Sequence, residues 1–102
     1  MERYMVRYKV KPERASENEN YIKEVFKQLK NVAPEGIRYA AFKLDDGVSF
    51  VHIASIETED GENPVSTLST FKAFLSEIKE RCDEPPALSE LNDVGSYRFL
   101  DR

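Results

Sequence analysis

His52 is the only histidine in the sequence, and its side chain is the one best suited to acid–base chemistry. It lies in the middle of an apolar run, Val48 to Glu57, that has the composition of a strand. An imidazole in that position could line a cavity and act there as a general base or as a ligand. The alternative is a buried structural histidine that is hydrogen-bonded to the backbone or to a tyrosine hydroxyl. One histidine alone is a weak signal for catalysis, so this alternative is favoured.

Tyrosines recur in the runs that we predict to be strands, and each combines a flat ring with a hydroxyl group. Such rings suit a pocket for a flat, partly polar ligand, and they suit a dimer core equally well. These tyrosines are Tyr4, Tyr8, Tyr39 and Tyr97. Arginines in the same runs could hold a carboxylate or a phenolate, although a place at the rim beside acidic residues suits them better. These arginines are Arg7, Arg38 and Arg98.

From these residues we predict a site with one catalytic group and several ligand contacts. His52 is the candidate catalytic residue, and the candidate ligand-binding residues are Tyr39, Arg38, Phe50 and Tyr97. We predict no metal site and no cofactor. The acidic run from Glu57 to Glu62 matches no calcium-loop spacing and lacks the His or Cys that transition metals prefer, so it is interpreted as a solvated loop.

Other kinds of chemistry lack the residues that they need. Cys82 is the only cysteine, so no intrachain disulfide, Cys-rich zinc site or CxxC redox pair can form. The serines and threonines show no nucleophile elbow, and the glycines form no phosphate-binding motif. Hydrolase and nucleotide-binding functions are therefore rejected.

The composition is that of one ordinary globular domain, which we expect to span residues 1–102. The net charge of −4 comes from 19 acidic and 15 basic residues, and the basic residues are scattered, so no nucleic-acid partner is expected. The N-terminus alternates charged and apolar residues, unlike a signal peptide or a membrane span. We expect a cytoplasmic protein with no membrane contact, and the single cysteine fits a reducing compartment.

The first half of the chain shows a strand, a helix and a hairpin. Residues 3–10 alternate apolar and polar side chains, and Pro12 ends this strand. Ser16 and Glu19 have the spacing of a capping box at the start of a helix over about 13–33.

The hairpin joins strands over 37–44 and 48–57 through Asp45-Asp46-Gly47. A two-residue loop would place Phe42 opposite Val51, Ala40 opposite Ile53, Ala41 opposite His52 and Tyr39 opposite Ala54, whereas a three-residue loop would shift this register by one.

The second half of the chain predicts a helix and a last strand. A polar connection over 58–64 leads to a helix with apolar residues from Val65 to Ile78, which is interrupted near Ser69 and ends before the segment 83–86. The last strand is predicted over 93–100. The order β-α-β-β-α-β predicts an α+β, ferredoxin-like fold, in which two helices cover one face of a four-stranded antiparallel sheet and the first and third strands are central.

The open face of this sheet is predicted to need a partner. Strands 37–44 and 48–57 carry apolar side chains on both faces, although only one face can be covered by the two helices. Leaving such side chains in water forgoes about 1.5 to 3 kcal/mol for each one that could be fully buried. We therefore predict a homodimer that forms through the sheet face.

The pattern resembles the dimeric α/β-barrel proteins, in particular the antibiotic-biosynthesis-monooxygenase-like domains, over essentially the whole chain. The matching segments are a first strand running into VKPE, Gly36 to Tyr39 at the start of the second strand, FVHIASIE in the third, and STFKAF in the second helix. The resemblance implies two sheets packed face to face around a cavity. In that cavity, some members of the family oxidise polyaromatic or quinol-type substrates or degrade haem. Members with oxygenase activity typically have a Trp just after the third-strand Glu and a His in or before the second helix. Here Thr58 and Glu59 follow Glu57, no Trp is present, and the only His lies within the third strand.

The sequence leaves the function unknown. The preferred hypothesis is a small homodimer with a cavity between sheet and helices for a small apolar or aromatic molecule. One alternative is a cofactor-independent monooxygenase, or a related isomerase or decarboxylase, that uses His52 and the strand tyrosines on an aromatic or quinol-type substrate. The other is a module that binds or senses such a molecule without transforming it.

Overall fold

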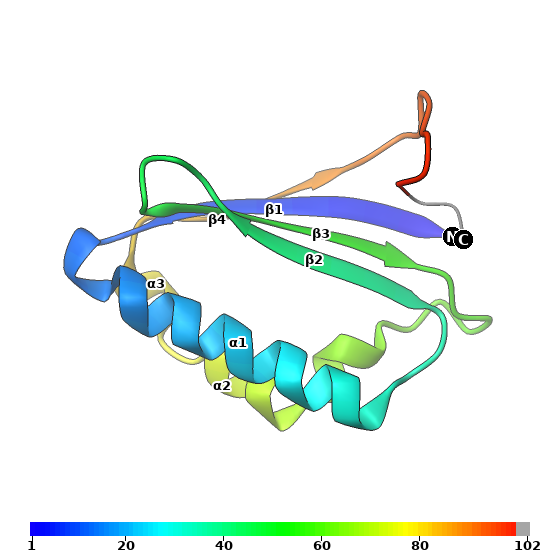
Figure 1. The fold of residues 1–102 in the computed structure, drawn as a ribbon, viewed down its shortest axis with the longest axis horizontal. Helices are drawn as coiled ribbons and strands as arrows, with labels where there is room; N and C mark the ends of the chain where they lie inside the picture. The colour runs from blue at the N-terminus through cyan, green and yellow to red at the C-terminus, as the bar shows by residue number, and fades with distance from the viewer. Residues whose placement is uncertain (100–102) are drawn as a thin grey trace.

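A four-stranded antiparallel sheet with helices on one face forms the centre of the computed structural model, which describes residues 1–99 (Figure 1). The strands lie in the order β2-β3-β1-β4, and they are β1 (Glu2–Val10), β2 (Ile37–Lys43), β3 (Ser49–Ile56) and β4 (Cys82–Glu90). The ferredoxin-like fold is therefore confirmed, with β1 and β3 at the centre of the sheet.

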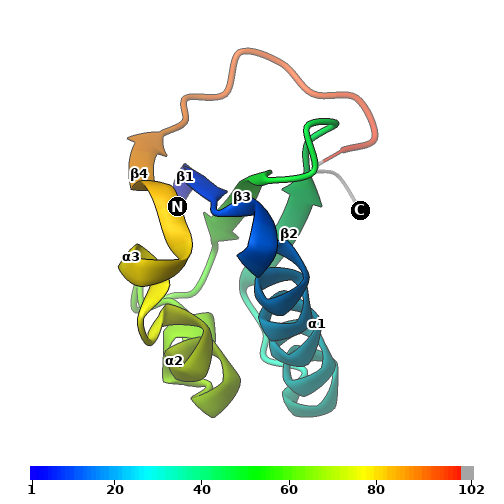
Figure 2. The same ribbon diagram turned by 90° about the vertical axis from the view of Figure 1, so that its left-hand side faces the viewer.

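The helices lie together beneath the sheet (Figure 2). The 3₁₀ helix Pro12–Arg14 leads into α1 (Ala15–Val32), and the 3₁₀ helix Pro64–Thr67 precedes α2 (Ser69–Leu75) and α3 (Ile78–Arg81). The second predicted helix is thus divided into three pieces, and the predicted interruption near Ser69 is confirmed. The later break, between α2 and α3, occurs at Glu77, whose backbone is left-handed with φ of 60°.

The predicted capping box at the start of α1 is wrong. The 3₁₀ helix runs directly into α1, so that Ser16 is already inside the helix and its side chain makes no capping hydrogen bond. Arg14 occupies the capping position instead, and its guanidinium forms an ion pair with Glu17 at 2.8 Å. Glu19 is bound by Lys43 from β2 at 2.8 Å, which ties the first turns of α1 to the hairpin.

The register of the hairpin is the one predicted for a two-residue loop. Phe42 lies opposite Val51 and Ala41 opposite His52. The Asp46 carboxylate accepts hydrogen bonds from the backbone N–H groups of Val48 and Ser49 and from the Ser49 hydroxyl. These three donors lower the pKa of Asp46 to about 2, because they stabilise its charged form.

The predicted position of the last strand is wrong. The fourth strand spans Cys82–Glu90, whereas residues 91–99 contain no helix or strand and residue 100 lies outside the described residues. The chain leaves α3 beside the end of β1, where the Lys11 N–H donates to the Arg81 carbonyl, so pairing with β1 begins at once. β4 is an edge strand, and its pairing with β1 is irregular between Arg7–Ala87 and Lys9–Glu84, so Pro85 and Pro86 fall where no ladder pair needs their N–H groups.

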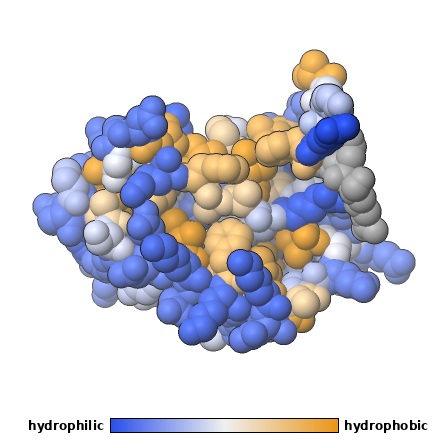
Figure 3. Space-filling model, viewed as in Figure 1, coloured by the Kyte–Doolittle hydropathy of each residue, from blue (hydrophilic) through white to orange (hydrophobic). Residues whose placement is uncertain are grey.

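The hydrophobic core lies between the sheet and the helices. Its most deeply buried side chains come from β1, β3, α1 and α2, and include Tyr8, Val10, Val25, Phe50 and Phe74. Apolar side chains gather in the band between the sheet and α1, while hydrophilic side chains cover the outer surface of the helices (Figure 3). Among residues 1–99, no helix has the length and apolar character required to span a membrane.

Candidate functional site

His52 is held between two tyrosine hydroxyls inside the molecule. Its Nε2 lies 2.8 Å from the Tyr8 hydroxyl oxygen, and its Nδ1 lies 2.6 Å from that of Tyr39. The three side chains come from β3, β1 and β2, so the register of the central strands brings them together. With 5% of its surface exposed, His52 is the buried, tyrosine-bonded histidine that the sequence favoured.

A chain of hydrogen bonds continues from Tyr8 to a buried cation. Asn18 on α1 donates through Nδ2 to the Tyr8 hydroxyl oxygen at 2.9 Å, and Arg81 Nε donates to Asn18 Oδ1 at 3.3 Å. Asn18 and Arg81 are both completely buried. Neither residue was predicted as a site residue from the sequence. The available signal was that Asn18 occupies the helical stripe of Ile22 and Val25, where an apolar residue is expected.

Arg81 is the largest completely buried side chain of the described residues. Its guanidinium donates to the carbonyl oxygens of Phe74 at 2.5 Å and Ser76 at 3.0 Å, at the end of α2. The same group stacks over the ring of Tyr21, with 4.6 Å from the guanidinium carbon to the ring centroid. Carbonyl oxygens and an aromatic face therefore solvate a positive charge that has no carboxylate beside it among residues 1–99.

A cavity of about 180 Å³ lies next to His52, between the sheet and the segment from Asn63 to Ile78. We call it the His52 cavity. Its lining is largely apolar, and it also includes the polar side chains of Tyr8, Tyr39 and His52 and the hydrogen-bonded pair Tyr4 and Asn63. The lining residues are Tyr4, Val6, Tyr8, Tyr39, His52, Asn63, Val65, Phe71, Phe74, Leu75, Ile78, Pro86 and Leu88.

Burial sets the protonation states of the three polar side chains His52, Tyr8 and Tyr39 in this lining. It lowers the pKa of His52 to about 4, because the charged imidazolium would lose its hydration. Burial also raises the pKa of both Tyr8 and Tyr39 above the ordinary tyrosine value. At neutral pH the group therefore consists of a neutral imidazole and two protonated phenols, which can exchange hydrogen bonds without a net charge.

The predicted ligand-binding residues are not all at the cavity. Tyr39 lines it, whereas Phe50 is buried in the core against Tyr8, with 5.5 Å between ring centroids. Arg38 lies outside the cavity lining, and its Nε is 3.1 Å from a carboxylate oxygen of Glu57. Tyr97 follows the end of the sheet and is 75% exposed, so its predicted place on a strand is wrong.

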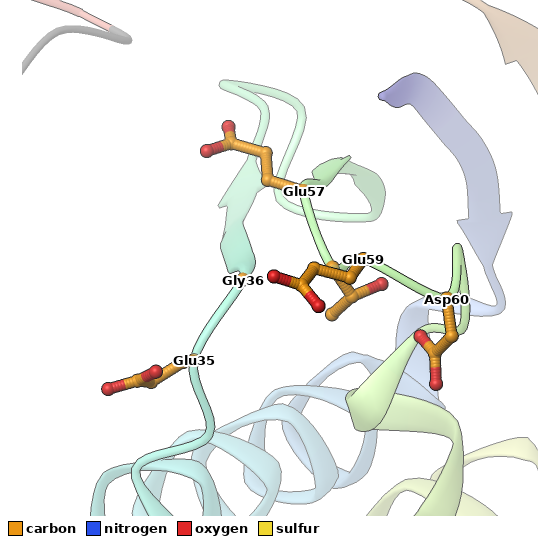
Figure 4. A pocket seen from close by; sticks show the side chains of 6 residues that line it. Glu35, Gly36, Glu57, Glu59 and Asp60 are labelled. Carbon is orange, nitrogen blue, oxygen red and sulfur yellow. The ribbon is translucent and has the colours of Figure 1, made fainter.

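A second hollow lies where the loops after α1 and β3 meet, and its lining is acidic (Figure 4). The side chains of Glu35, Glu57, Glu59 and Asp60 point in different directions. Glu57 is already bound by Arg38 and by the Ser55 hydroxyl, which lowers the pKa of its carboxyl group. Within residues 1–99 no three His, Cys, Asp or Glu side chains are grouped so that they could hold a metal ion.

Solved structures share this fold at low sequence identity. Rv0793 from Mycobacterium tuberculosis is 14% identical with a TM-score of 0.74, and the match covers 93% of this chain and 96% of that protein. A Caulobacter crescentus protein, named provisionally as an antibiotic biosynthesis monooxygenase, is 20% identical with a TM-score of 0.70 over 92% of this chain and 90% of its own. A Nitrosomonas europaea protein with the same provisional name is 13% identical with a TM-score of 0.73, and the match covers 91% of this chain and 89% of that protein.

These similarities confirm, for the fold, the resemblance to the antibiotic-biosynthesis-monooxygenase-like proteins. No protein-family model matches the sequence, and no curated protein matches it significantly.

Proposed function

We propose that the His52 cavity binds a small aromatic molecule of one ring that carries an oxygen substituent. The observation that supports this most directly is a largely apolar lining that includes a hydrogen-bonded polar group, formed by His52, Tyr8 and Tyr39. An apolar wall with a few convergent polar groups is typical of a small-molecule site. The apolar side chains favour the ring, and the polar group orients its oxygen.

The size of the cavity limits the ligand. An engineered apolar cavity of about 150 Å³ in another protein accommodates benzene, and the His52 cavity measures about 180 Å³. A ring with one or two substituents therefore fits, whereas fused ring systems would require the segment containing α2 to move.

Binding is tested with phenol and anisole against 1-naphthol and a three-ring phenol. We expect the one-ring compounds to raise the melting temperature and the larger compounds to leave it unchanged, since a ligand stabilises the state that binds it. Val6→Phe would fill the cavity and abolish this shift. Val32→Phe is the matched control, because Val32 is exposed on α1 and does not line the cavity. A shift of equal size in both variants would contradict binding at this site.

A second candidate function is a monooxygenase reaction on a one-ring quinol. It is supported by the provisional names of similar structures and by the imidazole of His52 in the cavity lining. One atom of O₂ enters the ring and the other leaves as water, while the quinol supplies the two electrons that are needed. His52 would act as the general base, and because both of its ring nitrogens face tyrosine hydroxyls, the hydroxyl proton of the quinol would reach it through Tyr39.

Oxygen consumption distinguishes this reaction from binding alone. With hydroquinones as substrates, His52→Ala is expected to lower the rate at least about 100-fold if the imidazole acts as the base. Binding without oxygen consumption would instead support a module that senses the molecule. An unchanged rate in His52→Ala would remove the candidate base.

We also propose that two copies of the chain associate through the open face of the sheet. Phe42 on this face is 46% exposed, and Val51 and Ile53 are only half-buried. Residues 91–99, which we call the C-terminal arm, pass over this face (Figure 2). A hollow of about 500 Å³ separates arm and sheet, and Val94 and Phe99 remain 101% and 64% exposed. A partner that enters this space would bury apolar surface on both sides.

The association predicts a molecular mass near twice 11.8 kDa by light scattering at micromolar concentration. Phe42→Asp is expected to shift the protein towards the monomer, because it places a charge on the apolar face that association would bury. Val32→Asp is the control, since Val32 is also exposed, at 55%, but lies on α1. A wild-type protein that is monomeric under these conditions would contradict the proposal.

A further inference from the structure

The direction of the hydrogen-bond chain at His52 follows from the chemistry of Arg81. A guanidinium group has donors and no acceptor, so the atom of Asn18 that faces Arg81 must be the amide oxygen. The Asn18 amide nitrogen is then turned towards Tyr8, to which it donates at 2.9 Å. Both side chains are completely buried, so neither is free to turn to solvent. Arg81 therefore makes the Tyr8 hydroxyl oxygen an acceptor on its Asn18 side.

The Tyr8 hydroxyl still has its own proton to donate. Within residues 1–99 its hydrogen-bond partners are Asn18 and His52, and only His52 Nε2 can accept. If Nε2 carried a proton instead, the Tyr8 oxygen would receive two donors, and its own proton would lack an acceptor on a residue that is 2% exposed. Leaving a buried donor unpaired is unfavourable. The proton of Tyr8 is therefore directed to Nε2.

A neutral imidazole has one N–H group, which is then at Nδ1 and faces the Tyr39 oxygen at 2.6 Å. Tyr39 thus accepts a hydrogen bond from His52, and its own proton has no acceptor among the described side chains. Tyr39 lines the His52 cavity and is less buried than Tyr8. The unused donor of the chain is therefore the Tyr39 hydroxyl, at the wall of the cavity.

We propose that Arg81, acting through Asn18 and Tyr8, holds His52 in the Nδ1–H tautomer and leaves the Tyr39 hydroxyl as the hydrogen-bond donor to the ligand. Arg81 and Asn18 are positioning residues, since neither lines the cavity. The ligand class that follows is a one-ring molecule with an acceptor oxygen, such as an aryl ether or an aryl ketone. This ligand class rests on the proposed function, whereas the tautomer does not.

The tautomer is measured by ¹⁵N NMR, which is unambiguous here because His52 is the only histidine. We expect a protonated Nδ1 and an unprotonated Nε2 in the wild-type protein. In Asn18→Asp the new carboxylate would accept from both Arg81 and the Tyr8 hydroxyl. The Tyr8 oxygen would then accept from Nε2–H, and the tautomer would reverse.

Asn20→Asp is the matched control, because Asn20 lies on the same helix as Asn18 but is exposed. In this variant the tautomer of His52 should be the same as in the wild type. A wild-type protein with Nε2–H, or an Asn18→Asp variant with an unchanged tautomer, would overturn the inference. If Asn18→Asp does not fold, the wild-type spectrum still decides which nitrogen carries the proton.

The ligand class is tested with anisole and ethylbenzene, which have the same number of heavy atoms and differ in the acceptor oxygen. Titration calorimetry is expected to give about three- to tenfold tighter binding of anisole, the range of one hydrogen bond, and Tyr39→Phe should remove the difference. Equal affinities in the wild type would refute the donor role of Tyr39 and leave the proposed binding function standing. Failure of both compounds to bind would refute the binding function, while the tautomer measurement would remain valid.

Discussion

Replacing Arg81 with methionine is expected to lower the free energy of unfolding by about 2 to 4 kcal/mol. The variant would leave two buried acceptors without a donor, the Phe74 carbonyl and Asn18 Oδ1. Each such acceptor costs about 1 to 3 kcal/mol. The variant also removes the unfavourable desolvation of the guanidinium. The expected loss of stability is therefore smaller than the largest combined cost of the two acceptors.

Urea unfolding followed by circular dichroism measures this loss, and Arg14→Met is its control. Arg14 differs from Arg81 because it pairs with a carboxylate, that of Glu17, its side chain is 29% exposed, and the pair lies on the surface. Solvent screening keeps the contribution of such a surface pair small, so the loss in Arg14→Met is expected to be much smaller than the loss in Arg81→Met. Equal losses in the two variants would show that the buried position of Arg81 has no special effect on stability.

The protein is expected to lose about 3 kcal/mol of stability between pH 6.5 and pH 4 because of His52 alone. The pKa of His52 falls from the ordinary 6.5 to about 4 in the folded protein. As the pH falls below 6.5 the unfolded chain binds a proton that the folded protein refuses, so acid favours unfolding. Each pKa unit corresponds to about 1.36 kcal/mol, and the loss is complete below the folded pKa.

The carboxyl groups act at lower pH and can be separated from this effect. The pKa values of Glu17, Glu19 and Glu57 are lowered below the ordinary 4.5, so their stabilisation is present above pH 4.5 and is lost only as the pH falls further. The window from 4.5 to 6.5 therefore reports on His52. Urea unfolding of His52→Gln, which does not titrate, should show no slope in this window. A slope equal to that of the wild type would assign the effect to another group.

The low pKa of His52 also helps to distinguish the two candidate functions. A base with a pKa of about 4 is largely unprotonated at pH 7, and it is a weak acceptor of protons from a phenol. Binding of an oxygen-bearing ring needs only the hydrogen bonds that a neutral imidazole and two phenols exchange. The measured pKa of His52 with ligand present is therefore informative, because a value raised towards 7 would favour the oxygenase reaction.

The order of the elements and the hairpin register could be predicted from local patterns. Alternation of apolar residues defines β1, and Asp46-Gly47 between two apolar runs defines the pairing of Phe42 with Val51. The preference of Asp-Gly for a tight turn and the alternation of side chains along a strand each depend on a few neighbouring residues. Both can therefore be recognised in a single sequence. His52 and Tyr39 were recognised as site residues for the same reason, since both interrupt strands with polar groups.

The fourth strand and the polar chain depend on contacts between distant segments. Residues 93–99 have strand-like composition, yet the free edge of β1 is taken by Cys82–Glu90, which the chain reaches first when it leaves α3. Asn18 and Arg81 are 63 positions apart and meet only because α1 and the end of α3 pack beneath the same sheet. Local preference describes what a segment can form, whereas the partner available in the folded chain selects what it does form. His52 could be identified from the sequence alone, but the two tyrosines, the amide and the guanidinium that orient it come together only in three dimensions.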